Sequence, residues 1–280
     1  AVAAGDLAVS DAERAAYAAD VREAREALRA VVGPFEVPAT VQLQDRHHWI
    51  DANVATFRRV LAPLDGDVMG VARVANTGSM AAALAFLARN VLGQYDPRLL
   101  GDGEHALYFV YPNVENAAET LGVDRERFRR WLAFHEVAHA AEFGAAPWLA
   151  GHVEDHIEEG VAALADGSVD SDVFAELDTT MTAVEGYAEL LMDRAFDGEY
   201  ADLRTALDAQ RRGGGPLTRL LRRLFGVGLK RRQYERGKAF FEAVVDARGL
   251  EVAGRVWEAP ENLPTETELD DPSRWVARME

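Results

Sequence analysis

The segment that decides the fold is FRRWLAFHEVAHAAEF, residues 128–143. Asp124 can cap the start of a helix at this point, and the helix is expected to end near Gly144, with Pro147 beyond it. Apolar side chains occupy more than one side of this helix, which leaves little room for a face in contact with water. The sequence therefore predicts a buried central helix.

Two histidines of this helix stand four residues apart, in the motif HEVAH at residues 135–139. The i, i+4 spacing aims the imidazoles of His135 and His139 at one point and places Glu136 at its edge. Zinc favours imidazole nitrogen, and a catalytic zinc site keeps one position for a water molecule. The motif predicts Zn²⁺ held by His135 and His139, with Glu136 as the general base that takes the proton of that water.

The third ligand distinguishes the classes of zinc enzyme that share this motif. The longer pattern HExxHxxGxxH fails, because Glu142 occupies its glycine position and Ala145 its third histidine position. A carboxylate from a second helix is the other solution, and Glu185 in VEGYAEL is the best candidate. Val184 and Ala188 flank it on an apolar stripe, where an unpaired charge would be costly. The sequence excludes a metzincin and favours a ligand set of two histidines and one glutamate.

Other acidic residues remain open as the third ligand: Glu154, Asp155, Glu158, Glu159 and Asp193. The first four lie in a strongly acidic stretch that is typical of a solvated surface. Glu189, one turn after Glu185, is predicted to accept the outer N–H of a ligand histidine and so to fix its ring. The alternative for Glu189 is a solvated charge on the helix.

A few further side chains are candidates for contact with substrate or with an oxyanion. His152 and His156 form another i, i+4 pair, which could build a separate site or touch substrate but is more typical of an exposed amphipathic turn. Tyr187, Tyr234 and Arg232 could stabilise an oxyanion, although such residues are far more often structural. A second metal is therefore not the favoured interpretation.

The rest of the chain is expected to be mainly α (α+β), with a small sheet beside the central helix. The predicted elements are helices at residues 10–32, 48–61, 78–91 and 172–195 and a strand at residues 106–111. Ser10 and Glu13 have the spacing of a capping box. The first 95 residues are predicted to be all-helical. One or two strands should pair with ALYFVY, which could also bind an extended substrate along its edge.

Three regions are expected along the chain, and they should form one compact unit. An N-terminal helical region covers residues 1–100, a core with the metal site covers residues 101–212, and a C-terminal helical region at residues 213–280 packs on that core. The run Gly-Gly-Gly-Pro at residues 213–216 is the strongest loop signal and could mark a boundary. Residues 211–238 hold ten basic residues and one acid, which pairing within the chain explains most simply.

The composition is that of a globular protein with an acidic surface. Of the 280 residues 49% are hydrophobic, and the absence of cysteine excludes disulfides, cysteine-ligated zinc fingers and a thiol nucleophile. A formal charge of −17 opposes binding to nucleic acid or anionic lipid. No uncharged run is long enough to cross a membrane, and no signal-peptide pattern begins the chain. A cytoplasmic protein is expected, with an unassigned oligomeric state.

Several segments together resemble one family, the zincin-like hydrolases of actinobacteria and archaea, of which one branch is associated with biosynthesis of the deazaflavin coenzyme F-420. The resemblance covers about residues 41–280. It rests on DRHHWIDAN (45–53), VLGQYDP (91–97), Pro112-Asn113, FRRWLAFHEVAHAAEF (128–143), PWL (147–149), VEGYAELLMD (184–193), KRRQYERGKAFFEAVVDARG (230–249) and VWEAPENLPTETELDDPSRWVAR (256–278).

The resemblance implies a mostly helical zincin-like fold, with His135, Glu136 and His139 at the metal and base positions. Glu185 matches the EGxA segment of the family, and Tyr187 stands where many relatives have histidine. We therefore expect a gluzincin-like zinc hydrolase that cleaves a peptide or a small amide. The alternative is a non-proteolytic binding or scaffold protein of zincin fold, linked to deazaflavin coenzyme biosynthesis.

Overall fold

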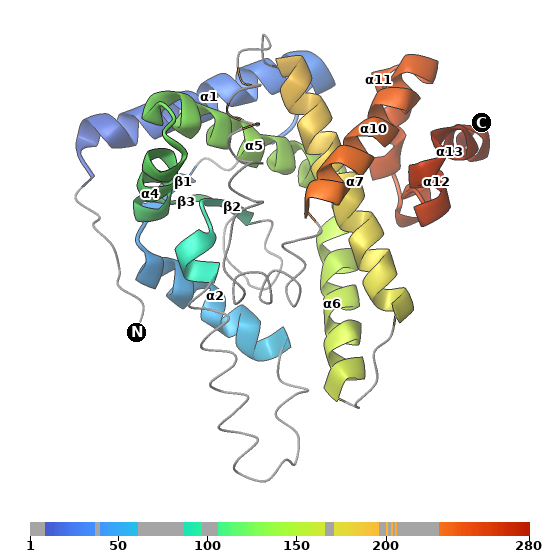
Figure 1. Ribbon diagram of the computed structural model, residues 1–280, viewed down its shortest axis with the longest axis horizontal. Helices are drawn as coiled ribbons and strands as arrows, with labels where there is room; N and C mark the ends of the chain where they lie inside the picture. The colour runs from blue at the N-terminus through green and yellow to red at the C-terminus, as the bar shows by residue number, and fades with distance from the viewer. Residues whose placement is uncertain are drawn as a thin grey trace.

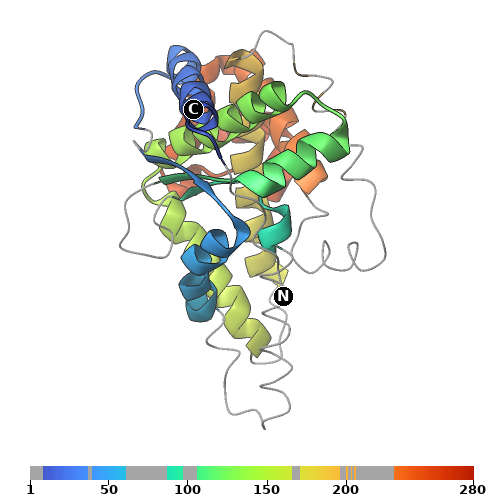
Figure 2. The ribbon, with the colours of Figure 1, turned by 90° about the vertical axis from the view of Figure 1, so that its left-hand side faces the viewer.

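The computed structural model describes residues 9–36, 40–60, 87–96, 106–165, 171–195, 200, 203, 205 and 230–280. It is mainly helical with one three-stranded sheet, which confirms the predicted fold class. Helix α1 (Asp11–Val32) lies at one end of the molecule and α6 (Leu149–Ala165) at the other, with the sheet and α5 (Arg125–Ala145) between them (Figure 1, Figure 2).

Helix α5 is the central helix that the sequence predicts. Its N-cap is Asp124, whose carboxylate accepts a hydrogen bond of 2.9 Å from the backbone N–H of Arg127. Large side chains such as Phe128 and Phe134 are completely or almost completely buried along it. Helices α1, α4 (Tyr111–Leu121) and α7 (Ser171–Ala195) and strand β2 (Gly93–Asp96) pack around it.

The sheet has the order β1-β3-β2, with β3 (Ala106–Val110) in the middle. Strand β1 (Thr40–Gln44) pairs with β3 in parallel, and β2 pairs with it antiparallel. The predicted strand is thus confirmed with two partners, but Tyr111 already belongs to helix α4. The expectation of an all-helical first 95 residues is wrong, because β1 and most of β2 lie within them. Both sides of β3 are occupied, so its edge is not open to a substrate.

The helices that flank the core begin and end close to their predicted positions. Helix α1 starts with the predicted capping box, in which Ser10 and Glu13 satisfy each other's backbone N–H groups. Helix α2 spans Arg46–Val60. Of the helix expected at residues 78–91, residues 87–90 are helical, and residues 78–86 lie outside the described residues.

Helices α7 and α10 (Lys230–Arg248) pack closely against each other, and two glycines meet at their crossing. A Cβ atom added to Gly186 would lie 2.2 Å from the backbone carbonyl carbon of Gly237. Since any side chain here would overlap the neighbouring backbone, the glycine of the EGxA segment is required for this packing. This crossing fixes the position of α7 at Gly186, the residue next to Glu185.

The C-terminal part of the chain wraps around α10 in short helices. These are α11 (Leu250–Gly254), the 3₁₀ turns Arg255–Trp257 and Pro260–Asn262, α12 (Glu266–Asp270) and α13 (Pro272–Met279). One hydrophobic core joins residues of α1, α5, α7, α10 and α13, among them Leu28, Phe128, Leu190, Phe240 and Trp275. The glycine-rich run at residues 213–216 and most of the basic segment lie outside the described residues. Among the described helices, none is long and apolar enough to span a bilayer.

Candidate metal centre

Helices α5 and α7 bring His135, His139 and Glu185 together. The Nε2 atoms of the two histidines lie 3.3 Å apart, and Glu185 Oε2 lies 4.0 Å from that of His135 and 3.8 Å from that of His139. One ligand atom from each residue lies within 4.8 Å of the other two. The arrangement joins the i, i+4 pair of one helix to the carboxylate of another, as the spacing in the sequence predicts.

This donor set fits a zinc ion. Zinc binds imidazole nitrogen at about 2.0–2.1 Å in a tetrahedron, which places two ligand atoms about 3.4 Å apart. The observed separation of the two Nε2 atoms, 3.3 Å, matches such an edge. Two imidazoles and one carboxylate leave a fourth position for water or substrate, the pattern of catalytic rather than structural zinc.

Each histidine ring is held by a side chain of its own helix. The ring of Trp131 stacks on His135 with centroids 5.5 Å apart and planes 9° from parallel. The Nδ1 atom of His139 lies 2.8 Å from Oε2 of Glu142, whose side chain is completely buried. That contact turns Nε2 of His139 towards Glu185 and favours the tautomer in which Nε2 is free to bind a metal.

This role of Glu142 is not among the predictions from the sequence, in which Glu142 stands only at the failed glycine position of a longer motif. The residue predicted to contact a histidine is Glu189. Glu189 is buried one turn beyond Glu185. The spacing of three residues between His139 and Glu142 is the signal that could have identified the pair, because such residues are neighbours on a helix.

The site brings the buried acidic residues Glu136, Glu142 and Glu185 close to the two histidines. Burial lowers the pKa of His139, but the hydrogen bond and charge of Glu142, with the charges of Glu185 and Glu136, outweigh it and raise the pKa to about 9. Burial also raises the pKa of Glu142 to about 7, against the opposing effect of His139. The cluster of carboxylates around the two imidazoles is therefore suited to a cation.

Glu136 lies against the edge of the sheet. Its Oε2 atom accepts a hydrogen bond of 2.9 Å from the backbone N–H of Tyr95 in β2, and the residue is 6% exposed. Gly93 of the same strand leaves space for this side chain, since a Cβ there would lie 2.7 Å from Glu136 Oε1. Strand β2 thus sets the position of the carboxylate next to His135.

The alternative third ligands lie elsewhere. Glu154 and Glu158 form ion pairs with Arg59, and Asp193 pairs with Lys238. Asp155 and Glu159 are exposed on α6. In the part of the chain that the structure describes, Glu185 is the acidic residue that groups with His135 and His139 as a potential metal site.

The other candidate residues do not belong to this group of ligand atoms. The rings of His152 and His156 lie with centroids 4.3 Å apart and planes tilted by 51°. They face α7, where Thr180 lies 3.3 Å from His152 and Glu176 lies 2.8 Å from His156. They are half-buried rather than exposed.

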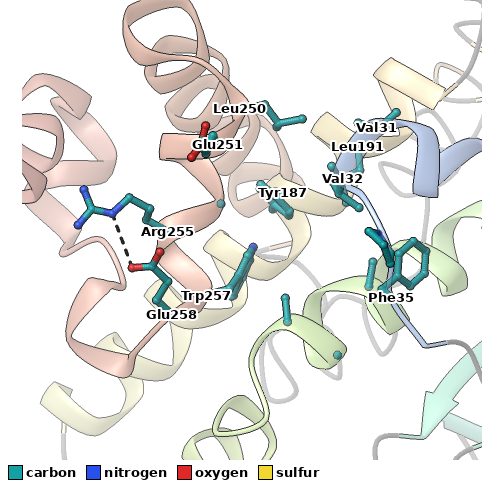
Figure 3. Close-up of a pocket in the computed structure, with 15 residues that line it drawn as sticks. Val31, Val32, Phe35, Tyr187, Leu191, Leu250, Glu251, Arg255, Trp257 and Glu258 are labelled. Atoms are coloured by element: carbon teal, nitrogen blue, oxygen red, sulfur yellow. Dashed lines mark ion pairs between the residues drawn. The ribbon is translucent and has the colours of Figure 1, made fainter.

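Two of the three predicted oxyanion candidates, Tyr234 and Arg232, have side chains outside the described part of the structure. Tyr187 packs against Phe241 and Trp257 and lines a cavity (Figure 3). Burial and the charge of Glu142 raise its pKa.

Comparison with known proteins gives two matches. The model of a family described as zincin-like metallopeptidase matches residues 1–173 and 159–276. A crystal structure from Chloroflexus aurantiacus, described as that of a presumed hydrolase with a novel fold, is similar with a TM-score of 0.78 and 32% sequence identity. The match covers 97% of this chain and 92% of that one. A search among curated proteins gives no match.

Proposed function

Because the chain belongs to the family of zincin-like metallopeptidases, we propose that it is a zinc hydrolase that cleaves an amide or peptide bond. The observation that carries the proposal is the approach of Glu185 to the Nε2 atoms of His135 and His139. These three residues would hold the metal. The similarity to a presumed hydrolase over nearly the whole chain supports the same class of reaction.

Bound zinc would supply a Lewis acid that polarises the substrate carbonyl and lowers the pKa of a water molecule. Glu136 would accept a proton from the attacking water and later deliver it to the departing amine. Its carboxylate is suited to this role because the N–H of Tyr95 holds one oxygen while the side chain stays next to His135. Glu142 keeps the ring of His139 in one orientation, so the site need not rearrange during the reaction.

Metal analysis of the purified protein tests the ligand set. We expect about one zinc per chain in the wild type and a large loss in His135→Ala and in Glu185→Ala, since a catalytic site uses three protein ligands. Asp193→Ala, which changes another acid of α7, serves as the matched control and should keep its zinc. Full zinc content in Glu185→Ala would assign the third position to another residue.

Activity on a mixture of peptides, followed by mass spectrometry, tests the general base. We expect Glu136→Gln to keep zinc and lose activity by about 10²–10⁴-fold, because the amide keeps the shape but cannot take a proton. Glu126→Gln, on the exposed first turn of the same helix, should remain active. Activity that survives in Glu136→Gln excludes this residue as the base. A zinc-loaded wild type without hydrolytic activity on peptides or small amides favours the binding-protein alternative.

A further inference from the structure

The strand that contacts Glu136 is also held from the other face of the sheet. Among the described strands, β2 is last in the order β1-β3-β2, and its four residues pair with β3. A strand at the end of a sheet has ladder hydrogen bonds on one side only. Any further contact of β2 therefore bears on the position of the Glu136 carboxylate, to which the N–H of Tyr95 donates.

The side chains of β2 alternate between the two faces of the sheet. A Cβ at Gly93 would lie 2.7 Å from Glu136 Oε1 of α5. The ring centroid of Tyr95 lies 5.8 Å from that of Phe143, which also belongs to α5. Gln94, between them, points to the opposite face, on which α2 packs (Figure 1, Figure 2). Helices α5 and α2 thus contact the same strand from opposite sides.

Three hydrogen bonds form a closed ring that includes the side chain of Gln94. The indole Nε1 of Trp49 donates to Gln94 Oε1 at 2.8 Å, and Gln94 Nε2 donates to Asn53 Oδ1 at 3.3 Å. Asn53 Nδ2 in turn donates to the backbone carbonyl of Trp49 at 2.7 Å. Because an indole N–H can only donate, it determines which end of each amide is the oxygen. We call Trp49, Asn53 and Gln94 the α2 clamp.

The α2 clamp is anchored in a small hydrophobic cluster. Trp49 is 4% exposed and packs there with Ala88 and with Val110 of β3. A large ring in a closely packed cluster has little space for another orientation. The N–H that reaches Gln94 therefore comes from a fixed position on α2.

The backbone of β2 connects this clamp to Glu136. The N–H with which Tyr95 contacts the carboxylate belongs to the peptide group that joins Gln94 to Tyr95, and this group is planar with the Cα atoms of both residues. Gly93, which leaves room for the carboxylate, is the residue before Gln94. A shift of Gln94 would therefore change both the hydrogen bond to Glu136 and the space around it.

We infer that Gln94 is a positioning residue for the general base, and that Trp49 and Asn53 act on Glu136 through it. This inference rests on the proposed function, in which Glu136 accepts the proton of the attacking water. It gives a role in hydrolysis to α2, a helix that provides none of the three grouped ligand atoms. Loosening the α2 clamp should reduce turnover and leave the zinc content unchanged, because those ligands belong to α5 and α7.

Nuclear magnetic resonance of the full chain with ¹⁵N-labelled tyrosine tests the hydrogen bond without a measurement of activity. The amide signal of Tyr95 is assigned by its disappearance in Tyr95→Phe. Glu136→Gln gives the direction in which the signal moves when the charged acceptor is lost. We expect Asn53→Ala, which removes the acceptor of Gln94 Nε2, to move the signal in the same direction.

Asp51→Ala is the matched control for Asn53→Ala, because it changes an exposed residue of the same helix, and it should leave the Tyr95 signal in place. Thermal unfolding shows whether each variant is folded. An unmoved Tyr95 signal in folded Asn53→Ala would overturn the inference, whether or not the protein proves to be a hydrolase.

Kinetics of the zinc-loaded protein on a peptide that it cleaves provide the second arm. Gln94→Met keeps the approximate size of the side chain but forms neither hydrogen bond of the clamp. We expect kcat to fall about 10-fold with KM unchanged, a smaller loss than the roughly 10²-fold effect of a 1 Å displacement. Asn53→Ala should lower kcat in the same way, and Asp51→Ala should not.

A double variant tests whether Asn53 acts through Gln94. If it does, Gln94→Met with Asn53→Ala should be no slower than Gln94→Met alone. Wild-type kcat in Gln94→Met, or losses that multiply in the double variant, would overturn the inference. Full activity of Glu136→Gln would instead overturn the proposed function, in which this residue is the base.

Discussion

The backbone N–H of Tyr95 in β2 donates a hydrogen bond of 2.9 Å to Glu136 Oε2, so the sheet holds the carboxylate that follows the first histidine of the motif. Gly93, two residues earlier, faces the same carboxylate. Strand β2 therefore positions Glu136 in two ways: Tyr95 donates a hydrogen bond to its carboxylate, and Gly93, which has no side chain, leaves room for it.

Gly93→Ala should reduce hydrolytic activity without removing the metal. The new Cβ would lie 2.7 Å from Glu136 Oε1 and 2.9 Å from its Cδ and Cγ, so the whole side chain must move. A displacement of about 1 Å of a catalytic group can cost about 10²-fold in rate. We expect a loss of that order in kcat/KM, with zinc content and thermal stability close to wild type. Unchanged activity in a zinc-loaded Gly93→Ala protein would contradict the assignment of Glu136 as base.

Glu142→Ala should weaken zinc binding by about 10- to 100-fold, the usual effect of removing a carboxylate that orients a ligand histidine. Glu142→Gln should have a smaller effect, because its amide oxygen can still accept the Nδ1–H of His139. Competition with a chelator of known affinity measures both values, and Glu126→Gln on the same helix is the control. Equal zinc affinity in Glu142→Ala and the wild type would show that the 2.8 Å contact does not position the ring.

The features that could be predicted from the sequence are those that depend on local periodicity. Helix α5, its cap at Asp124 and the shared direction of His135 and His139 follow from spacings of three and four residues. The approach of Glu185 to the histidines could also be anticipated, because a carboxylate on an apolar helix stripe calls for a buried partner. Its role as a ligand remains a prediction.

The features that could not be predicted depend on contacts between distant segments. Strands β1 and β2 have five and four residues, too few to show a clear pattern, and Thr40 pairs with Ala106 across a long stretch of chain. The position of the Glu136 carboxylate depends on β2 and therefore could not be predicted either. The hydrogen bond between Glu142 and His139 is different, because it is local and the spacing of three residues could have indicated it; only the side-chain conformation that forms it is not specified by the motif.

Gly186→Ala should destabilise the fold at the crossing of α7 and α10. The added Cβ would lie 2.2 Å from a backbone atom of Gly237, so the helices must move apart, with an expected cost of at least about 1–3 kcal/mol. Gly151→Ala is a matched control within a helix, because nothing lies within 4 Å of its Cβ position, and it should stabilise the protein slightly. Urea denaturation measures both. Wild-type stability in Gly186→Ala would show that the close crossing is not required.

Glu13→Gln should change how the stability of the protein depends on pH in the acid range. Hydrogen bonds from Tyr111 and from the backbone and side chain of Ser10 lower the pKa of Glu13 from 4.5 to about 2. Because the folded protein holds the charged form more tightly, this stabilisation is complete above pH 4.5 and is lost as the pH falls towards 2. The free energy of unfolding of wild type should therefore exceed that of Glu13→Gln above pH 4.5, and the difference should shrink below it.

Glutamine can still complete the capping box, so the comparison isolates the charge. A constant difference between wild type and Glu13→Gln from pH 7 to 3 would contradict the prediction.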